Sequence, residues 1–294
     1  APGGRFPLPS SVLMTAITAR VAGVSRVVVV TPSQDDIMLG AAFIAGADSV
    51  LQAGGAHAVA AVTYGTASVE PVDMVVGPGN RWVTAAKSIV SGEVGIDMLA
   101  GPSELLVVAD AGVCPQTVAA DLLAQAEHDP DARPILVTRS ESVVNAVDRA
   151  IGEQLAVLST ASIAERALQN GAAVICTSNA EIVAVVNAVA PEHLELIGPE
   201  AEALASEIQH YGGLFIGEHA AEVLGDYGAG PNHTLPTGGT ARFAGGLSVF
   251  NFLRVRTWMR IDAIDAAQSL VRDAEVLAEL EGLAGHAVAA RARR

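Results

Sequence analysis

The sequence predicts an α/β protein with two sheet domains and a helical C-terminal tail. Three observations lead to this prediction. Apolar runs of strand length alternate with helix-forming segments over residues 1–103, and a second array of the same kind and similar size follows. This βαβα order is typical of open parallel sheets with helices on both faces. The tail differs from both arrays, because residues 264–283 carry apolar side chains at a helical period.

The first array begins with a run of four valines within residues 26–31, which indicates a buried strand. The stretch Pro32-Ser-Gln-Asp-Asp36 that follows predicts a turn and an N-cap. The next elements expected are a helix near 37–45, a strand at 50–51, a helix near 56–62, a strand at 74–76 and a helix at 81–90.

Two glycine-rich turns follow strands of this array, Gly54-Gly55 and Gly77-Pro-Gly79. Neither is a complete dinucleotide fingerprint, since the third glycine is missing after Gly79. A strand–turn–helix order nevertheless directs backbone N–H groups to the carboxyl edge of a sheet, where ligands bind in such folds. On the motif alone, ordinary tight turns are the better interpretation.

The Gly101-Pro102 pair marks a turn between the two arrays. We expect a cofactor-side domain over residues 1–102, a second domain over 103–247 with most metal and catalytic residues, and a tail over 248–294. The elements expected in the second domain are strands at 105–109, 134–138, 172–176 and 214–216 and helices at 115–127, 140–155, 162–169 and 179–189.

Composition narrows the classes of function. The 294 residues are 51% hydrophobic and carry a net charge of −15, so we expect neither a nucleic-acid partner nor an anionic membrane surface. The longest uncharged stretch, 49–69, is rich in small residues, which argues against a membrane span. Cys114 and Cys176 lie far apart in apolar surroundings and read as buried thiols, which favours a reducing compartment, the cytoplasm.

Gln125 and His128 are three residues apart in a segment that reads as helix, so their side chains share one face. Acidic residues flank His128, and Pro130 ends the helix. This combination is a possible half-site for a metal ion. By itself, a solvated helix end with a surface histidine is the commoner explanation.

Glu192 and His193 precede a strand pattern. An unperturbed imidazole titrates near neutral pH, so His193 is a candidate general base, and Glu192 is a candidate for activating a water molecule. If the stretch is extended, the two side chains point to opposite sides. The alternative is a polar loop before an edge strand.

Residues 225–239 are so dense in glycine, proline and asparagine that we expect no regular structure there. Long loops of this kind are usually functional, and Asp226 and His233 are the chemical candidates. The helical tail carries Glu281, and His286 follows it. Such a helix needs a partner surface, either its own core or another subunit.

Taken in order, several motifs resemble those of the histidinol dehydrogenase family: Gly-Pro-Gly-Asn at 77–80, Ala-Gly-Pro-Ser-Glu at 100–104, Gln-Ala-Glu-His at 125–128, Pro-Glu-His-Leu-Glu at 191–195, Gly-Asp-Tyr at 225–227 and Asn-His-Thr-Leu-Pro-Thr at 232–237. The resemblance implies two incomplete Rossmann-like domains. It also implies the four-electron oxidation of L-histidinol to L-histidine through the aldehyde, the last steps of histidine biosynthesis. Two NAD, one zinc ion and a homodimer with shared active sites would be required.

The resemblance also implies roles for individual residues of this sequence. The zinc ligands would be Gln125, His128, Asp226 and His286, and the catalytic pair Glu192 and His193. These ligands and His193 would also contact substrate, as would Ser103, His233 and Glu281. Asn80 would contact NAD, as would His57, which stands where the family usually has glutamine. The tail residues Glu281 and His286 would act in the active site of the neighbouring subunit.

The chain begins at Ala1-Pro-Gly-Gly4 without methionine. Family members carry a substantial segment before this position, with part of the substrate domain and a tyrosine that contacts NAD, so we expect an N-terminal truncation. Two alternatives follow. One is a paralogue that oxidises another small polar alcohol, such as a sulfonated diol, with the same zinc and base. The other is an inactive zinc-binding remnant.

Overall fold

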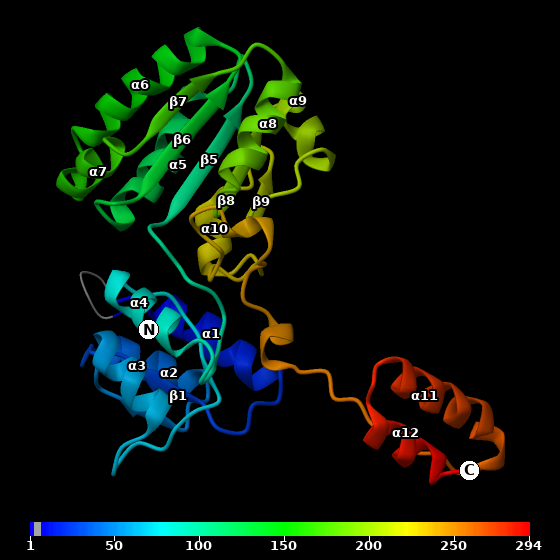
Figure 1. Cartoon of the computed structure of the whole chain (residues 1–294). Coiled ribbons are helices and arrows are strands. Elements are labelled where there is room, and N and C mark those ends of the chain that lie inside the picture. The colour runs from blue at the N-terminus through cyan, green and yellow to red at the C-terminus, as the bar shows by residue number, and fades with distance from the viewer. Residues whose placement is uncertain (3–6) are drawn as a thin grey trace. The chain divides into compact units, whose positions relative to one another are not determined.

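A parallel five-stranded sheet is the largest sheet of the computed structural model, which describes residues 1–2 and 7–294 (Figure 1). Gly3 and Gly4 of the expected Pro-Gly-Gly motif lie outside the described residues. The strand order is β7-β6-β5-β8-β9, and every pair is parallel. The strands are β5 (Glu104–Ala109), β6 (Arg133–Thr138), β7 (Ala172–Ile175), β8 (His193–Ile197) and β9 (Gly213–Ile216).

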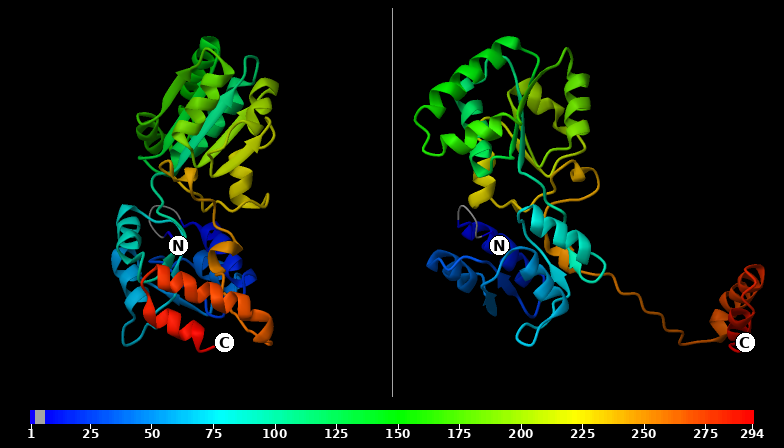
Figure 2. Two further views of the ribbon diagram at one scale, coloured as in Figure 1. Left: turned by 45° about the vertical axis from the view of Figure 1, so that its right-hand side comes forward. Right: turned by 60° about the vertical axis from the view of Figure 1, so that its left-hand side comes forward.

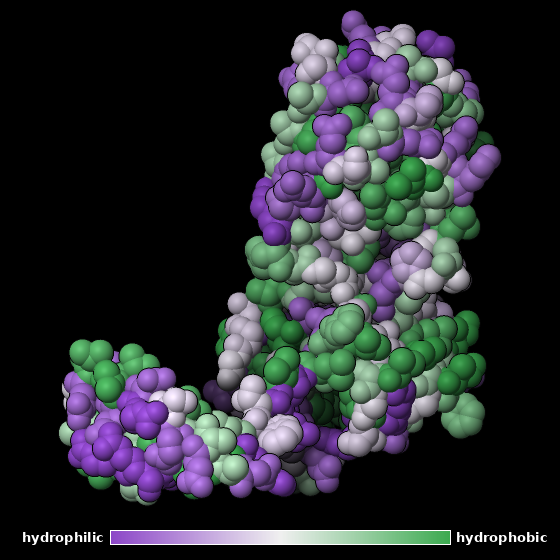
Figure 3. All heavy atoms as spheres, turned by 90° about the vertical axis from the view of Figure 1, so that its right-hand side faces the viewer, coloured by the Kyte–Doolittle hydropathy of each residue, from purple (hydrophilic) through white to green (hydrophobic). Residues whose placement is uncertain are grey.

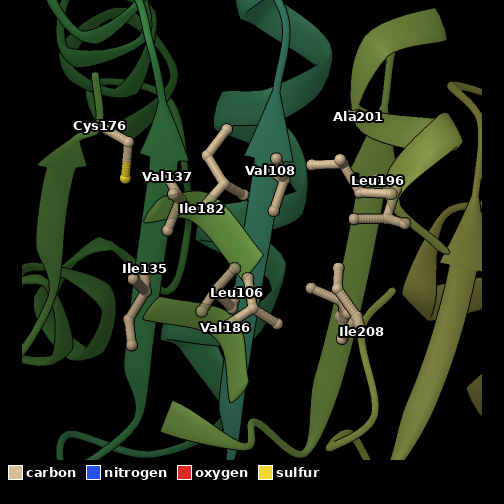
Figure 4. Close-up of a cluster of buried hydrophobic side chains, with 12 residues drawn as sticks. Leu106, Val108, Ile135, Val137, Cys176, Ile182, Val186, Leu196, Ala201 and Ile208 are labelled. Carbon is tan, nitrogen blue, oxygen red and sulfur yellow. The ribbon is translucent and has the colours of Figure 1, made fainter. Parts of the chain in front are cut away.

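Alternating side chains of β5 supply both halves of the core around this sheet. Leu106 and Val108 face α8, and Leu105 and Val107 face α5 and α6. All six residues of β5 are buried, as expected for a central strand covered on both faces. Figure 4 shows the α8 side. The covering helices are α5 (Pro115–His128), α6 (Glu141–Leu155), α7 (Ala161–Leu168), α8 (Asn179–Val189) and α9 (Pro199–Glu202).

We call the part of the chain before residue 102 the first lobe. Its strands form two small parallel sheets, β1 with β2 and β3 with β4. Asp35 caps α2 by accepting from the N–H of Ile37, which confirms the predicted N-cap. Asn80 caps α4 in the same way. The elements are α1 (Pro9–Val21), β1 (Val28–Val30), α2 (Asp36–Ile44), β2 (Ser49–Leu51), α3 (Gly55–Tyr64), β3 (Met74–Val75), α4 (Arg81–Val90) and β4 (Gly95–Ile96).

Two expectations and one alternative interpretation were wrong, each for a physical reason. The 225–239 segment starts inside a helix, α10 (Glu222–Tyr227), in whose first turn the N–H of Glu222 donates to the carboxyl group of Glu195. β8 is not an edge strand, since β9 pairs with its outer side. Cys114 is exposed, because it precedes α5 at the surface, whereas Cys176 is buried as expected.

The described chain divides into two units, Ala1–Leu253 and Arg254–Arg294. The expected boundary between residues 102 and 103 lies inside the first unit and stays a prediction. In the second unit, α11 (Gln268–Leu280) and α12 (Ala284–Arg291) pack side by side (Figure 2). None of the described helices is both long and apolar enough to cross a membrane.

Hydrophobic side chains also reach the surface. Figure 3 shows them gathered in several places rather than spread evenly. In the second unit, Val271 and Ala278 are buried between the helices, whereas Leu270, Leu277 and Leu280 are more than half exposed. The hydrophobic stripe that predicted this helix is therefore only partly covered within its own unit.

Candidate functional site

The candidate site lies at the amino edge of the five-stranded sheet. β5 and β8 both begin there, and the register pairs Leu105 with His193. Glu192 directly precedes β8, so the predicted acid–histidine pair lies next to the first residue of β5, Glu104. Sheet register alone thus brings together two motifs that are almost ninety residues apart.

The backbone of Glu104 holds both members of the pair. Its N–H donates to Glu192 Oε2 at 2.9 Å, and its carbonyl oxygen accepts from His193 Nδ1 at 3.2 Å. Glu192 Oε2 and His193 Nδ1 are 3.8 Å apart, so the two side chains do not point to opposite sides. The reason is that Glu192 lies before the strand, where the alternation of side chains does not yet apply.

His193 is held as a neutral imidazole whose Nε2 is free of a proton. A carbonyl oxygen can only accept, so Nδ1 carries the hydrogen. Burial lowers the pKa of His193 to about 4, against the opposing charge of Asp226. Nε2 faces Glu222 Oε1 at 3.5 Å, and burial raises the pKa of Glu222 to about 8. At neutral pH, Glu222 is therefore a carboxylic acid beside an unprotonated nitrogen.

Asp226 lies one helical turn after Glu222 on α10, and its partner is His233. His233 Nδ1 is 3.4 Å from Asp226 Oδ1, while its Nε2 is 3.2 Å from Ser11 Oγ of α1. Burial acts to raise the pKa of Asp226, but the hydrogen bond and charge of His233 outweigh it and the pKa is lowered. Ser11 lies within a helix and is buried, which makes it a structural partner of His233 rather than a nucleophile.

Behind Glu222, two further carboxyls continue into the interior. Glu195 accepts from the N–H of Glu222 at 2.7 Å, and Asp121 of α5 lies within hydrogen-bonding reach of Glu195. Burial raises the pKa of Glu195 to about 8 and that of Asp121 to about 6. Burial also raises the pKa of Glu192 well above its ordinary value. Glu192, Glu195 and Glu222 are thus desolvated acids whose raised pKa values favour the neutral form at neutral pH.

Two features of the site could hold a metal ion: the amide oxygen of Gln125 and a cluster of three further side chains. Gln125 is 1% exposed, and its Oε1 has no hydrogen-bond partner among the described residues. A buried oxygen without a hydrogen-bond partner is suited to coordinate a cation. Independently, His193, Glu222 and Asp226 offer ligand atoms within 4.8 Å of one another. Asp226 belongs to this group and to the set expected from sequence.

One cavity of about 1370 Å³ connects most of the residues singled out in the sequence. His57 lies exposed on α3, outside the cavity lining. Glu281 and His286 belong to the Arg254–Arg294 unit, where both are exposed. The expected site residues that line the cavity are Asn80, Ser103, Gln125, His128, Glu192, His193, Asp226 and His233.

The sequence interpretation missed Ser11, Glu104 and Glu222. A usable signal existed for Glu222, which stands four residues before Asp226 and therefore on the same helical face. Glu104 contributes through its backbone groups, and Ser11 lies 222 positions before its partner His233 in the sequence. No local pattern therefore marks either residue.

Comparison with known proteins identifies the family. The family model of histidinol dehydrogenase matches residues 1–294. The chain belongs to the histidinol dehydrogenase family. It is therefore an oxidoreductase, and the fold class expected from the sequence is confirmed.

Individual relatives agree along nearly the whole chain. Histidinol dehydrogenase of Acinetobacter baylyi is 46% identical over 297 residues, which cover 99% of this chain and 69% of that protein. Histidinol dehydrogenase of Pseudomonas aeruginosa is 48% identical over 297 residues, which cover 99% of this chain and 67% of that protein. The crystal structure of histidinol dehydrogenase from Elizabethkingia anophelis has a TM-score of 0.93 at 39% identity, with 99% of this chain and 69% of that chain covered.

The raised pKa values of the buried glutamates lead to a prediction of how the stability of the fold depends on pH. The folded pKa of Glu195 is raised, so its contribution is complete below its ordinary pKa and is lost as pH rises through about 8. In metal-free protein, Glu195→Gln should therefore unfold at a higher urea concentration than wild type at pH 8.5, and near the wild-type midpoint at pH 5. The exposed Glu165→Gln is the control, with little effect at either pH. Equal midpoints for Glu195→Gln and wild type at pH 8.5 would contradict the assignment.

Proposed function

We propose that this chain carries the oxidation of L-histidinol to L-histidine through L-histidinaldehyde, with one zinc ion per site and NAD as hydride acceptor. Membership of the histidinol dehydrogenase family supports this reaction. The observation that carries the proposal is the single cavity shared by candidate metal ligands and candidate base, which is lined by Gln125, His128, Glu192, His193 and Asp226.

Gln125, His128 and Asp226 would hold the zinc ion together with His286 from the tail of a second copy of the chain. This is a set of nitrogen and oxygen donors without thiolate, which suits zinc among other divalent ions. The orphaned Oε1 of Gln125 supports its role. His193 also satisfies the geometry of a ligand, but a nitrogen that binds a cation cannot at the same time accept a proton, and we assign His193 to proton transfer.

When bound, zinc would fix and polarise the donor groups of the substrate, and NAD would accept a hydride in each of two steps. His193 takes the hydroxyl proton on Nε2, the nitrogen left free by its bond to Glu104. Glu192, held by the N–H of Glu104, takes a proton from the water that adds to the aldehyde. Since burial raises the pKa of Glu192, its own proton must first pass to solvent in the cavity before the carboxylate can act as a base.

Substrate and cofactor would bind at different parts of the cavity lining. Ser103 and His233 line the cavity and would contact histidinol, with Glu281 supplied by the tail of a second copy. Asn80 lies in the first lobe, where its Oδ1 caps α4 through the N–H groups of Trp82 and Val83. Its Nδ2 group remains available as a donor to NAD. His57 would contact NAD only if it moves toward the cavity from its exposed position.

Turnover with defined substrates tests the proposal. Zinc-loaded protein should reduce NAD with histidinol, at two NADH for each histidine formed, and should be inactive with sulfonated diols. Preference for a sulfonated diol would favour the paralogue. Tight zinc binding with no turnover of either alcohol, also after supplying the segment present in the longer relatives, would favour the non-enzymatic remnant.

A pair of substitutions separates base from ligand. His193→Asn should lower turnover by ~100-fold or more, the usual contribution of a positioned general base, and should retain zinc. Glu192→Gln should retain zinc as well, yet allow a first burst of NADH and block the second oxidation. Rapid-mixing kinetics and elemental analysis measure both effects. Loss of zinc from His193→Asn would instead assign this residue to the metal site.

We also propose that the chain works as a homodimer with shared active sites. The tail leaves Leu270, Leu277 and Leu280 more than half exposed, so its apolar face needs another surface. Glu281 and His286 are then available to the site of a second copy.

Mixed dimers test this arrangement. A His128→Ala subunit refolded together with a His286→Ala subunit should regain activity, because one of the two sites then combines intact segments from both chains. Each variant alone should stay inactive. A mixture that remains inactive, while wild-type protein refolds to full activity under the same conditions, would show that sites are not shared.

A further inference from the structure

Lys87 of α4 and Asp97 form a buried ion pair beside the cavity. The side chain of Lys87 is 3% exposed and that of Asp97 is fully buried, and Nζ contacts Oδ1 directly. Removing two charges from water is costly unless the remaining donors and acceptors are also satisfied. The partners that satisfy them show what the pair does.

Both backbone polar groups of Gly77 are bonded to this pair. Lys87 Nζ donates to the carbonyl oxygen of Gly77 at 3.0 Å, and the N–H of Gly77 donates to Asp97 Oδ2 at 2.7 Å. Gly77 has a φ of +110°, a conformation that favours glycine. The pair therefore fixes a backbone geometry that other residues would not hold by themselves.

Gly77 is the first residue of the turn 77–80, which lines the cavity and ends at Asn80. The turn is tight, because a Cβ at Gly79 would lie 2.5 Å from the side chain of Val83. With Oδ1 of Asn80 committed to the cap of α4, the direction of its free Nδ2 group follows from the backbone of the turn. Whatever holds Gly77 thus aims the amide of Asn80.

The same pair also anchors the segment that crosses toward the metal side. Asp97 Oδ1 accepts from the N–H of Met98 at 2.7 Å, and Thr84 of α4 donates to the carbonyl oxygen of Ala100 at 2.7 Å. Gly101 then donates to the hydroxyl of Thr237, in the segment that carries His233. A displacement of Lys87 and Asp97 would move the turn 77–80 directly and the proposed metal ligands only indirectly.

We propose that Lys87 and Asp97 are positioning residues that set the turn 77–80 for a nicotinamide dinucleotide, rather than a general stabilising ion pair. The inference rests on the proposed function, because it assigns the turn to the cofactor of that reaction. Neither residue needs to touch the cofactor. Lys87 acts through the carbonyl oxygen of Gly77, and Asp97 acts through the N–H groups of Gly77 and Met98.

The test is the double substitution Lys87→Met with Asp97→Asn in the full chain, which removes both charges together and avoids leaving one buried ion unpaired. Arg20→Met with Asp48→Asn, which removes a partly exposed ion pair of the first lobe, is the control. That pair also holds backbone of the first lobe, with Arg20 donating to the carbonyl oxygen of Gly46 and Asp48 accepting from the N–H of Val27. Val27 lines the cavity, but the side chains of Arg20 and Asp48 do not. Calorimetric titration gives the Kd of NAD and of histidinol, and elemental analysis gives the zinc content.

The Lys87/Asp97 variant should bind NAD about 10-fold or more weakly, in line with the effect of a displaced positioning group. Its zinc content and histidinol affinity should match wild type, and the control variant should bind all three normally. This selective loss is not expected from a merely structural pair. If the double variant fails to fold, Asp97→Glu keeps both charges but displaces Gly77 by one methylene, and the same loss is expected.

Two outcomes overturn the inference in distinguishable ways. Wild-type affinity for NAD in a folded variant, or an equal loss in the control variant, refutes the positioning role and leaves the proposed function intact. Failure of the wild-type, zinc-loaded chain to bind NAD refutes the cofactor assignment, and the positioning role with it.

Discussion

The pairing of β5 with β8 is the constraint on which the rest of the site depends. It places Glu192 and His193 against the backbone of Glu104, whose N–H and carbonyl oxygen hold one side chain each. Backbone groups make good anchors, because they cannot change rotamer and remain in place as long as the sheet is intact. The tautomer of His193 follows from this contact, and so does the direction of the nitrogen that is free to accept a proton.

A site built from buried acids is costly in the absence of a cation. Glu192, Glu195 and Glu222 all have pKa values raised by burial, so each stays neutral where an exposed glutamate would be charged. A carboxyl kept neutral at rest can ionise once a positive charge enters the cavity. The free energy lost in folding would then be recovered in binding, which is the usual compromise between stability and activity.

The sequence was informative where the causes are local. The Asp35 cap, the buried run of β5 and the helix that ends at His128 follow from residues within a few positions of each other. Order of motifs was enough to reveal the family. The helix α1 went unpredicted, because its apolar residues do not gather on one face. The contacts of Glu104 and Ser11 depend on register and lobe packing, which no short stretch of sequence encodes.

The position of the site also agrees with the charge of what it would bind. Open parallel sheets usually bind ligands at the carboxyl edge, where the strand order switches. Here the switch lies between β5 and β8, and the carboxylate of Asp110 already accepts from the N–H groups of Glu200 and Ala201 at that edge. The side chain of Asp110 thus occupies N–H groups that could otherwise bind a phosphate at this edge.

The amino edge has the opposite electrostatic character, because helices end there. Gln125 and His128 lie in the last turn of α5, where the unpaired carbonyl groups make the helix end negative. That end favours cations, and Asp226 of α10, whose pKa is lowered by His233, adds to the effect. A phosphate-bearing cofactor is better served by the first lobe, where Asn80 marks the positive start of α4 on the same cavity. Two helix ends of opposite sign, on α5 and on α4, would thus separate the proposed metal site from the proposed dinucleotide site.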